Sequence, residues 1–158
     1  MRQILYVAHC LRPTEGEILA ASRETYPNVP LATMLNARRA LAWRLWLRDT
    51  FADVTFVAPW IGDILCGVDD DSEPSRALGM RDNCALVERL DGIVLCGPRI
   101  SSGMRAEVET FTARATSGAE YVSDVACVYD LTSLGATPPQ PGFLAPGTTF
   151  EHWVGTLS

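Results

Sequence analysis

Residues 92–117, GIVLCGPRISSGMRAEVETFTARATS, contain the clearest strand and helix of this chain. The run from Gly92 to Cys96 is short and apolar, which predicts a buried β-strand. Gly97 and Pro98 end this strand, and a helix is expected to begin at 102–103 and to reach about residue 117. The stretch therefore predicts a β–α unit of the kind that builds parallel sheets.

The same alternation continues on both sides of this unit. The runs QILYVA (3–8) and VTFVA (54–58) predict two more buried strands, and one or two further strands are expected within 121–129. Two long helices, 34–50 and 74–90, separate the first three strands. Apolar strands that alternate with helices predict an α/β fold, a single-domain open parallel sheet flanked by helices, as in Rossmann-like proteins.

Local signals also predict how the connecting segments fold. A short helix is expected around 15–22. Thr33 is the expected N-cap of the helix 34–50, and 60–73 is expected to be a loop before Pro74 opens the next helix. The helix 34–50 has an apolar stripe that we expect to face the core, formed by Leu35, Ala42, Trp43, Leu45 and Trp46.

The chain divides by composition into a domain and a tail. Residues 1–131 hold all the predicted strands and helices and are expected to form one α/β domain. Residues 132–158 are rich in Pro and Gly, as in TPPQPGFLAPG. We expect this tail to be irregular and to pack on the domain or on a partner subunit.

The composition indicates a folded acidic protein. Apolar residues make up 47% and charged residues 20% of the 158 residues, and the net charge is −6. An acidic chain is not expected to bind nucleic acid or an anionic membrane surface, because both favour basic patches. The sequence has no apolar run long enough to span a membrane. All 13 basic residues are arginines, which rules out a Schiff-base lysine and a P-loop lysine.

The five cysteines favour a reducing compartment. Their number is odd, no two have CxxC spacing, and most lie within apolar runs. Buried free thiols are therefore expected rather than disulfides. We expect a cytoplasmic protein.

Three loops follow the predicted strands at their carboxyl ends, where parallel sheets bind ligands. These loops are 9–13, 59–63 and 97–103. In the helix after the third loop, Glu107 lies about 60° from Met104, at the edge of the stripe formed with Val108, Phe111 and Ala115. Glu107 is therefore either a functional carboxylate or a buried one that bonds an arginine or tyrosine to hold the fold.

Other residues at this edge suggest a ligand site, and each has a structural alternative. Ser101, Ser102 and Gly103 at a helix N-terminus would bind phosphate or carboxylate, or one serine is simply an N-cap. Tyr6 in the first strand would orient a carboxylate, or it is a core tyrosine. His9 would contact a ligand, although a single histidine is a weak signal.

No metal site is expected. The acidic run 69–71 is better explained as a solvated loop, because three adjacent aspartates point in different directions. The only histidines are His9 and His152, too few for a typical histidine-based site. The sequence also contains no nucleophile elbow, GxGxxG or Walker motif.

Several motifs resemble the nucleoside 2-deoxyribosyltransferase-like superfamily, in particular a branch of short bacterial and phage proteins. The resemblance covers roughly residues 3–125. It rests on Asn36 and on four stretches: ILYVAHCLRP (4–13), VAPW (57–60), RDNCALVERLDGIVLCG (81–97) and SSGMRAEVETFTA (101–113).

The resemblance implies roles for individual residues. Glu107 matches the nucleophile that attacks the anomeric carbon of a ribosyl or deoxyribosyl group. Asp82 matches an aspartate that would protonate or position the leaving base, and Tyr6 matches a tyrosine that orients the nucleophile. Trp60 would stack on the base, or it is a core tryptophan. Asp91 is also shared and is interpreted as structural.

Two departures from the family pattern bear on the substrate. The transferases resemble Asp-x-Gly-x-x-x-Glu, whereas this chain has Ser101 at the first position. Members that hydrolyse nucleoside 5′-monophosphates carry a serine there, which contacts the phosphate. The first loop of the hydrolases is usually glycine-rich, and here either His9 or Arg12 would replace that contact or the substrate would differ.

The resemblance therefore predicts an N-glycosidase that hydrolyses a nucleotide or nucleoside, with a 5′-monophosphate as the favoured substrate. It implies no metal or organic cofactor and a homodimer or larger homo-oligomer. Two alternatives stay open: a nucleotide-sensing domain without catalysis, and a nucleoside 2-deoxyribosyltransferase.

Overall fold

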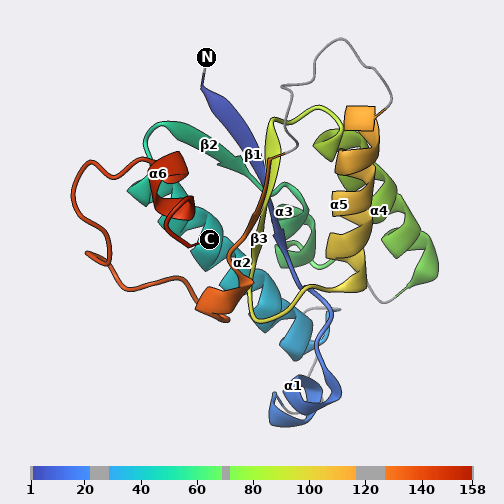
Figure 1. Cartoon of the computed structure of the whole chain (residues 1–158). Coiled ribbons are helices and arrows are strands. Elements are labelled where there is room, and N and C mark those ends of the chain that lie inside the picture. Colours follow the sequence, from blue (N-terminus) through green and yellow to red (C-terminus); the bar gives the residue numbers. More distant parts are fainter. Residues whose placement is uncertain (1, 22–28, 69–71, 117–126, 158) are drawn as a thin grey trace.

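The structure is a computed structural model that describes residues 2–21, 29–68, 72–116 and 127–157. Its centre is a four-stranded parallel sheet (Figure 1). The strands are β1 (Gln3–His9), β2 (Val54–Val57), β3 (Gly92–Cys96) and β4 (Cys127–Asp130), in the order β2-β1-β3-β4. The predicted parallel α/β fold is confirmed. Residues 121–126 of the last predicted strand segment lie outside the described residues.

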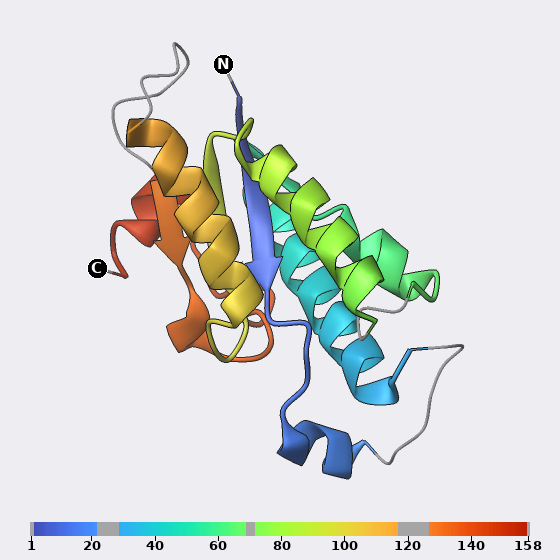
Figure 2. The same cartoon turned by 90° about the vertical axis from the view of Figure 1, so that its right-hand side faces the viewer.

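Helices cover both faces of the sheet. On one face, α2 (Leu31–Thr50) and the C-terminal α6 (Phe150–Val154) pack against β1 and β2. On the other face, α4 (Glu73–Val87) and α5 (Ser102–Thr116) pack against β1 and β3. Figure 2 shows that α4 and α5 lie side by side and that their first turns lie at the same end of the molecule as the end of β1.

Successive side chains of β1 point to opposite faces of the sheet and so enter the hydrophobic core on each face. Leu5 and Val7 face α2, whereas Tyr6 and Ala8 face α5, and all four are buried. This is the two-residue period of a strand that is covered on both faces. Asp91 ties β3 to β1, because its Oδ2 accepts a hydrogen bond of 2.7 Å from the backbone N–H of Ile4.

The helix α2 differs from its prediction at the N-terminus. It begins at Leu31 with Pro30 as its N-cap, so Thr33 lies inside the helix and does not cap it. The predicted stripe is also partly wrong, since Ala42 is exposed and Leu35 is half-buried. The helix is buried on more than one side: Ala40, Trp43 and Leu47 pack against the sheet, whereas Met34 and Ala37 pack with Val29 and Ile64. Its buried residues are Ala32, Thr33, Met34, Asn36, Ala37, Ala40, Trp43 and Leu47.

The segment after β2 is not the loop that was predicted. It contains the short helix α3 (Trp60–Leu65), which begins directly after Pro59. Proline presets the backbone angle φ for a helix start, and Ile61 and Ile64 lie one turn apart and are both buried. The acidic run 69–71 lies outside the described residues.

The short helix in the first loop is confirmed as α1 (Glu15–Ala20). A capping box begins it: the Thr14 hydroxyl accepts from the backbone N–H of Glu17, and the Glu17 carboxylate accepts from the backbone N–H of Thr14.

The C-terminal segment contributes to the core. It contains a 3-10 turn (Thr132–Leu134) and the helix α6, which were not predicted. Phe150 and Trp153 are buried one helical turn apart, and the Trp153 ring stacks on Phe51 with a centroid distance of 5.2 Å. Among the described helices, none is long and apolar enough to cross a bilayer.

Candidate active site

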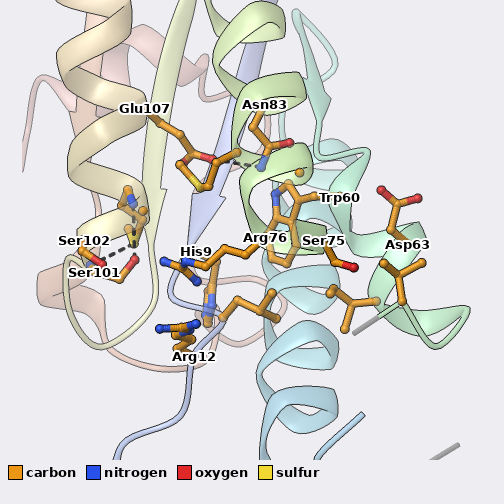
Figure 3. A pocket seen from close by; sticks show the side chains of 17 residues that line it. His9, Arg12, Trp60, Asp63, Ser75, Arg76, Asn83, Ser101, Ser102 and Glu107 are labelled. Carbon is orange, nitrogen blue, oxygen red and sulfur yellow. Dashed lines mark hydrogen bonds between the residues drawn. The ribbon is translucent and has the colours of Figure 1, made fainter. Parts of the chain in front are cut away.

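A cleft opens at the carboxyl ends of the strands, as expected for a parallel sheet (Figure 3). It encloses about 770 Å³ of space, including the part that opens to solvent. Side chains from the segments after β1, β2 and β3 line it, together with one face of α4.

Glu107 is the buried carboxylate of this cleft. It is 5% exposed, and its Oε1 accepts two hydrogen bonds, from the Tyr6 hydroxyl at 2.8 Å and from Asn83 Nδ2 at 3.2 Å. Burial raises the pKa of Glu107 to about 7, and the two hydrogen bonds act against this rise by stabilising the charged form. Because this pKa lies near physiological pH, both the ionised and the protonated forms of Glu107 are populated there.

The two oxygens of Glu107 lie in different surroundings. Oε1 is held by Tyr6 and Asn83, whereas Oε2 receives no hydrogen bond from the residues that the structure describes. Because Glu107 lines the cleft, Oε2 is the oxygen available to a bound molecule. A carboxylate fixed by one oxygen and open at the other is suited to nucleophilic or acid–base chemistry.

Tyr6 lies on the face of β1 that packs against α5, which brings its hydroxyl to Glu107. It is fully buried, and its neighbour on β3 is Ile93. Burial and the adjacent Glu107 raise the pKa of the Tyr6 hydroxyl, so this hydroxyl stays protonated and donates.

The loop after β3 forms a polar end of the cleft. Ser101 Oγ accepts a hydrogen bond of 3.3 Å from the backbone N–H of Met104, the contact expected of an N-cap. Ser102 and Gly103 line the cleft in the first turn of α5. Ser101 thus caps α5 and also lines the cleft. The N-terminal end of α5 favours a negative charge.

Two arginines add positive charge to the lining, Arg12 after β1 and Arg76 on α4. The Arg12 guanidinium is 4.0 Å from the Glu73 carboxylate, and both side chains are largely exposed. An exposed pair of this kind is weak, so a bound anion can draw Arg12 away from Glu73.

His9 forms part of the wall. It is 5% exposed, its Nδ1 lies 2.9 Å from the Cys10 carbonyl oxygen, and Nε2 has no partner among the described residues. Burial lowers the pKa of His9 to about 4, so the ring is neutral at pH 7 and Nδ1 carries the proton. A Cβ on Gly97, whose φ is +93°, would lie 2.6 Å from His9 Nε2, so only glycine fits beside the ring.

Trp60 belongs to both the cleft and the core. Its indole N–H donates to the Val7 carbonyl oxygen at 3.4 Å, and its ring lies at the cleft between α3 and α4 (Figure 3). Trp60 is therefore anchored in the core by its indole N–H, and its ring also lines the cleft.

Asp82 is a predicted site residue that does not line the cleft and contacts none of the other predicted site residues. Its side chain is 64% exposed and pairs with Arg81 at 2.9 Å. One residue is a rotation of about 100° on a helix, so Asn83 faces Glu107 while Asp82 faces solvent.

Sequence reasoning missed several lining residues of α4. Arg76, Gly79, Met80 and Asn83 line the cleft at positions i, i+3, i+4 and i+7. This spacing marks one helix face and was present in the sequence. Asp63 on α3 was not singled out either, although it ends the segment 59–63 that was expected at this edge of the sheet.

Among the described residues, no group of three or more His, Cys, Asp or Glu side chains is placed to hold a metal ion. No protein-family model matches the chain, and no curated protein matches it.

Proposed function

We propose that this protein hydrolyses the N-glycosidic bond of a nucleotide or nucleoside, and that a nucleoside 5′-monophosphate is its preferred substrate. The observation that carries the proposal is the asymmetric carboxylate of Glu107, with Oε1 held by Tyr6 and Asn83 and Oε2 open to the cleft. The resemblance of the surrounding motifs to nucleoside deoxyribosyl transferases and hydrolases supplies the reaction class.

In the proposed reaction, Glu107 Oε2 attacks C1′ of the sugar. The C1′–N bond breaks, its electron pair leaves with the base, and a covalent ester forms between the sugar and Glu107. Water then cleaves the ester: its hydroxyl group bonds to C1′, and its other proton ends on the departed base. This regenerates the carboxylate and releases the sugar. Tyr6 and Asn83 act by holding Oε1, so that Oε2 keeps one position below the sugar.

The polar end of the cleft supports a phosphorylated substrate. Ser101, Ser102 and the first turn of α5 would contact the phosphate, and Arg12 lies in the same lining. His9 is neutral and buried, so in this proposal it shapes the wall and Arg12 supplies the charge.

The resemblance further leads us to propose a homo-oligomer. The free thiols of the described cysteines lead us to propose a cytoplasmic protein, because thiols stay reduced there. Size-exclusion chromatography with light scattering measures the oligomeric state.

The test is base release from a panel of nucleosides and 5′-monophosphates, followed by chromatography, for wild type, Glu107→Gln and Glu109→Gln. Glutamine keeps an Oε1 that accepts from Tyr6 and Asn83, so the Glu107 variant is expected to fold. Glu109 is exposed on the same helix and provides a matched control.

We expect release from a monophosphate that falls at least about a thousandfold in Glu107→Gln and is unchanged in Glu109→Gln. Nucleotide binding by both variants, without release by wild type, would reject the enzyme and leave the sensing domain. Base exchange that exceeds hydrolysis when a second base is added would identify a transferase.

A further inference from the structure

Asp63 is a carboxylate in the cleft for which the proposed reaction has no use. It lies on α3 and lines the same cleft as Glu107, on the wall opposite α5 (Figure 3). Its side chain makes no hydrogen bond or ion pair with the residues that the structure describes. Asp63 is exposed at the cleft, so its carboxylate is accessible to a ligand that displaces water from it.

The charges of the cleft are separated along its length. Ser101, Ser102 and Arg12 lie at one end and Asp63 lies at the other, with Arg76 in the middle of the lining (Figure 3). Trp60 lies between Asp63 and Glu107 in this view. An anionic group of a ligand is attracted to the first end and repelled by the second. A nucleotide would therefore bind in one direction, with its phosphate near α5 and its base near Trp60 and Asp63.

We propose that Asp63 selects the base. It accepts a hydrogen bond from an exocyclic amino group, and it disfavours bases that carry a carbonyl at the same ring position. The inference rests on the proposed function in one respect only, that the ligand is a nucleotide or nucleoside.

The selectivity follows from the chemistry of a carboxylate, which only accepts hydrogen bonds. An amino group on the far edge of the base donates to it, whereas a carbonyl oxygen there meets a second acceptor and is repelled. A site built to bond one polar group rejects the analogue that lacks it more strongly than an apolar pocket does. An amide in place of the carboxylate both donates and accepts, so it removes the distinction.

The experiment compares pairs of 5′-monophosphates that differ by amino against carbonyl at one ring position, cytidine with uridine and adenosine with inosine. Wild type and Asp63→Asn are assayed for kcat/KM. Binding is measured by calorimetry in Glu107→Gln with and without Asp63→Asn. Asp49→Asn is the control, since Asp49 is an exposed aspartate on α2 that pairs with Arg48.

In wild type we expect at least one pair to favour the amino base by about tenfold or more, and Asp63→Asn to reduce this ratio to about threefold or less. Asp49→Asn is expected to keep the wild-type ratio. An equal loss for both members of each pair, or an unchanged ratio, would overturn the proposal. The proposal would also be overturned if Asp82→Asn, rather than Asp63→Asn, removed the preference for the amino base, because base selection would then belong to α4.

The two proposals fail separately. If wild type releases no base, the glycosidase is rejected, but the binding ratios in the Glu107→Gln background still test Asp63. If base release depends on Glu107 and the ratios do not depend on Asp63, only the assignment of Asp63 fails.

Discussion

The chemistry of the site depends on how one carboxylate is solvated. Glu107 combines burial, which opposes its charge, with two donors, which favour it, and its pKa of about 7 is the balance. At that pKa a large fraction is ionised at neutral pH, while the carboxylate stays poorly solvated and reactive. A more exposed glutamate would be fully ionised but stabilised by water.

A pH dependence follows for the proposed hydrolysis. The nucleophile must be ionised, so kcat/KM is expected to fall about tenfold per pH unit below pH 7 and to level off above it. Tyr6→Phe removes a donor to the charged form, so it raises the pKa of Glu107 and moves this limb to higher pH. Rates measured from pH 5 to 9 for both proteins test this. A profile that is flat across the range in wild type contradicts the assignment of Glu107.

At the scale of elements, the first loop is held by Glu17 of α1. The Glu17 carboxylate contacts Arg39 of α2 at 3.2 Å and Arg99 of the loop after β3 at 3.3 Å. Arg99 also donates to the Arg12 carbonyl oxygen, and Asn36 donates to the Leu11 carbonyl oxygen. The backbone that presents Arg12 to the cleft is thus fixed by side chains from three elements.

Glu17→Gln is expected to weaken this hold. The KM for a 5′-monophosphate should rise about threefold to tenfold with little change in kcat, because Arg12 is less well positioned while Glu107 is untouched. Stability should change by no more than about 1 kcal/mol, since the ion pairs are partly exposed. Glu15→Gln on the same helix, where Glu15 is exposed, is the control. An equal rise in KM in both variants would show that only the net charge matters.

At the scale of the whole molecule, the C-terminal segment belongs to the core that supports β1 and β2. Phe150 is fully buried and contacts the rings of Phe51, Phe56, Tyr129 and Trp153. The same side of the sheet carries α2, so α6 completes the layer that α2 leaves open.

Phe150→Ala is therefore expected to destabilise the protein by about 3 to 5 kcal/mol, the usual cost of removing a buried phenylalanine. Phe143→Ala in the same segment is the control, since Phe143 is 57% exposed and should cost no more than about 0.5 kcal/mol. Urea denaturation measures both variants. Similar midpoints for the two would mean that the tail does not stabilise the fold.

The sequence alone determined the alternation of strands and helices, because it depends on the local spacing of apolar residues. The strand Gly92–Cys96 and the short helix α1 are examples, each bounded by its own turn or capping residues. The position of Glu107 at the edge of an apolar stripe was also visible in the sequence.

The tertiary structure decided which side of each helix faces inward. Packing turned Asn83 rather than Asp82 toward Glu107 and placed Asp63 at the cleft. Turning a helix about its axis by one residue position, about 100°, keeps the same helical spacing of residues. The local sequence therefore cannot determine which side of the helix faces inward. The raised pKa of Glu107 also has a tertiary origin, because it arises from water that α4, α5 and β1 together exclude.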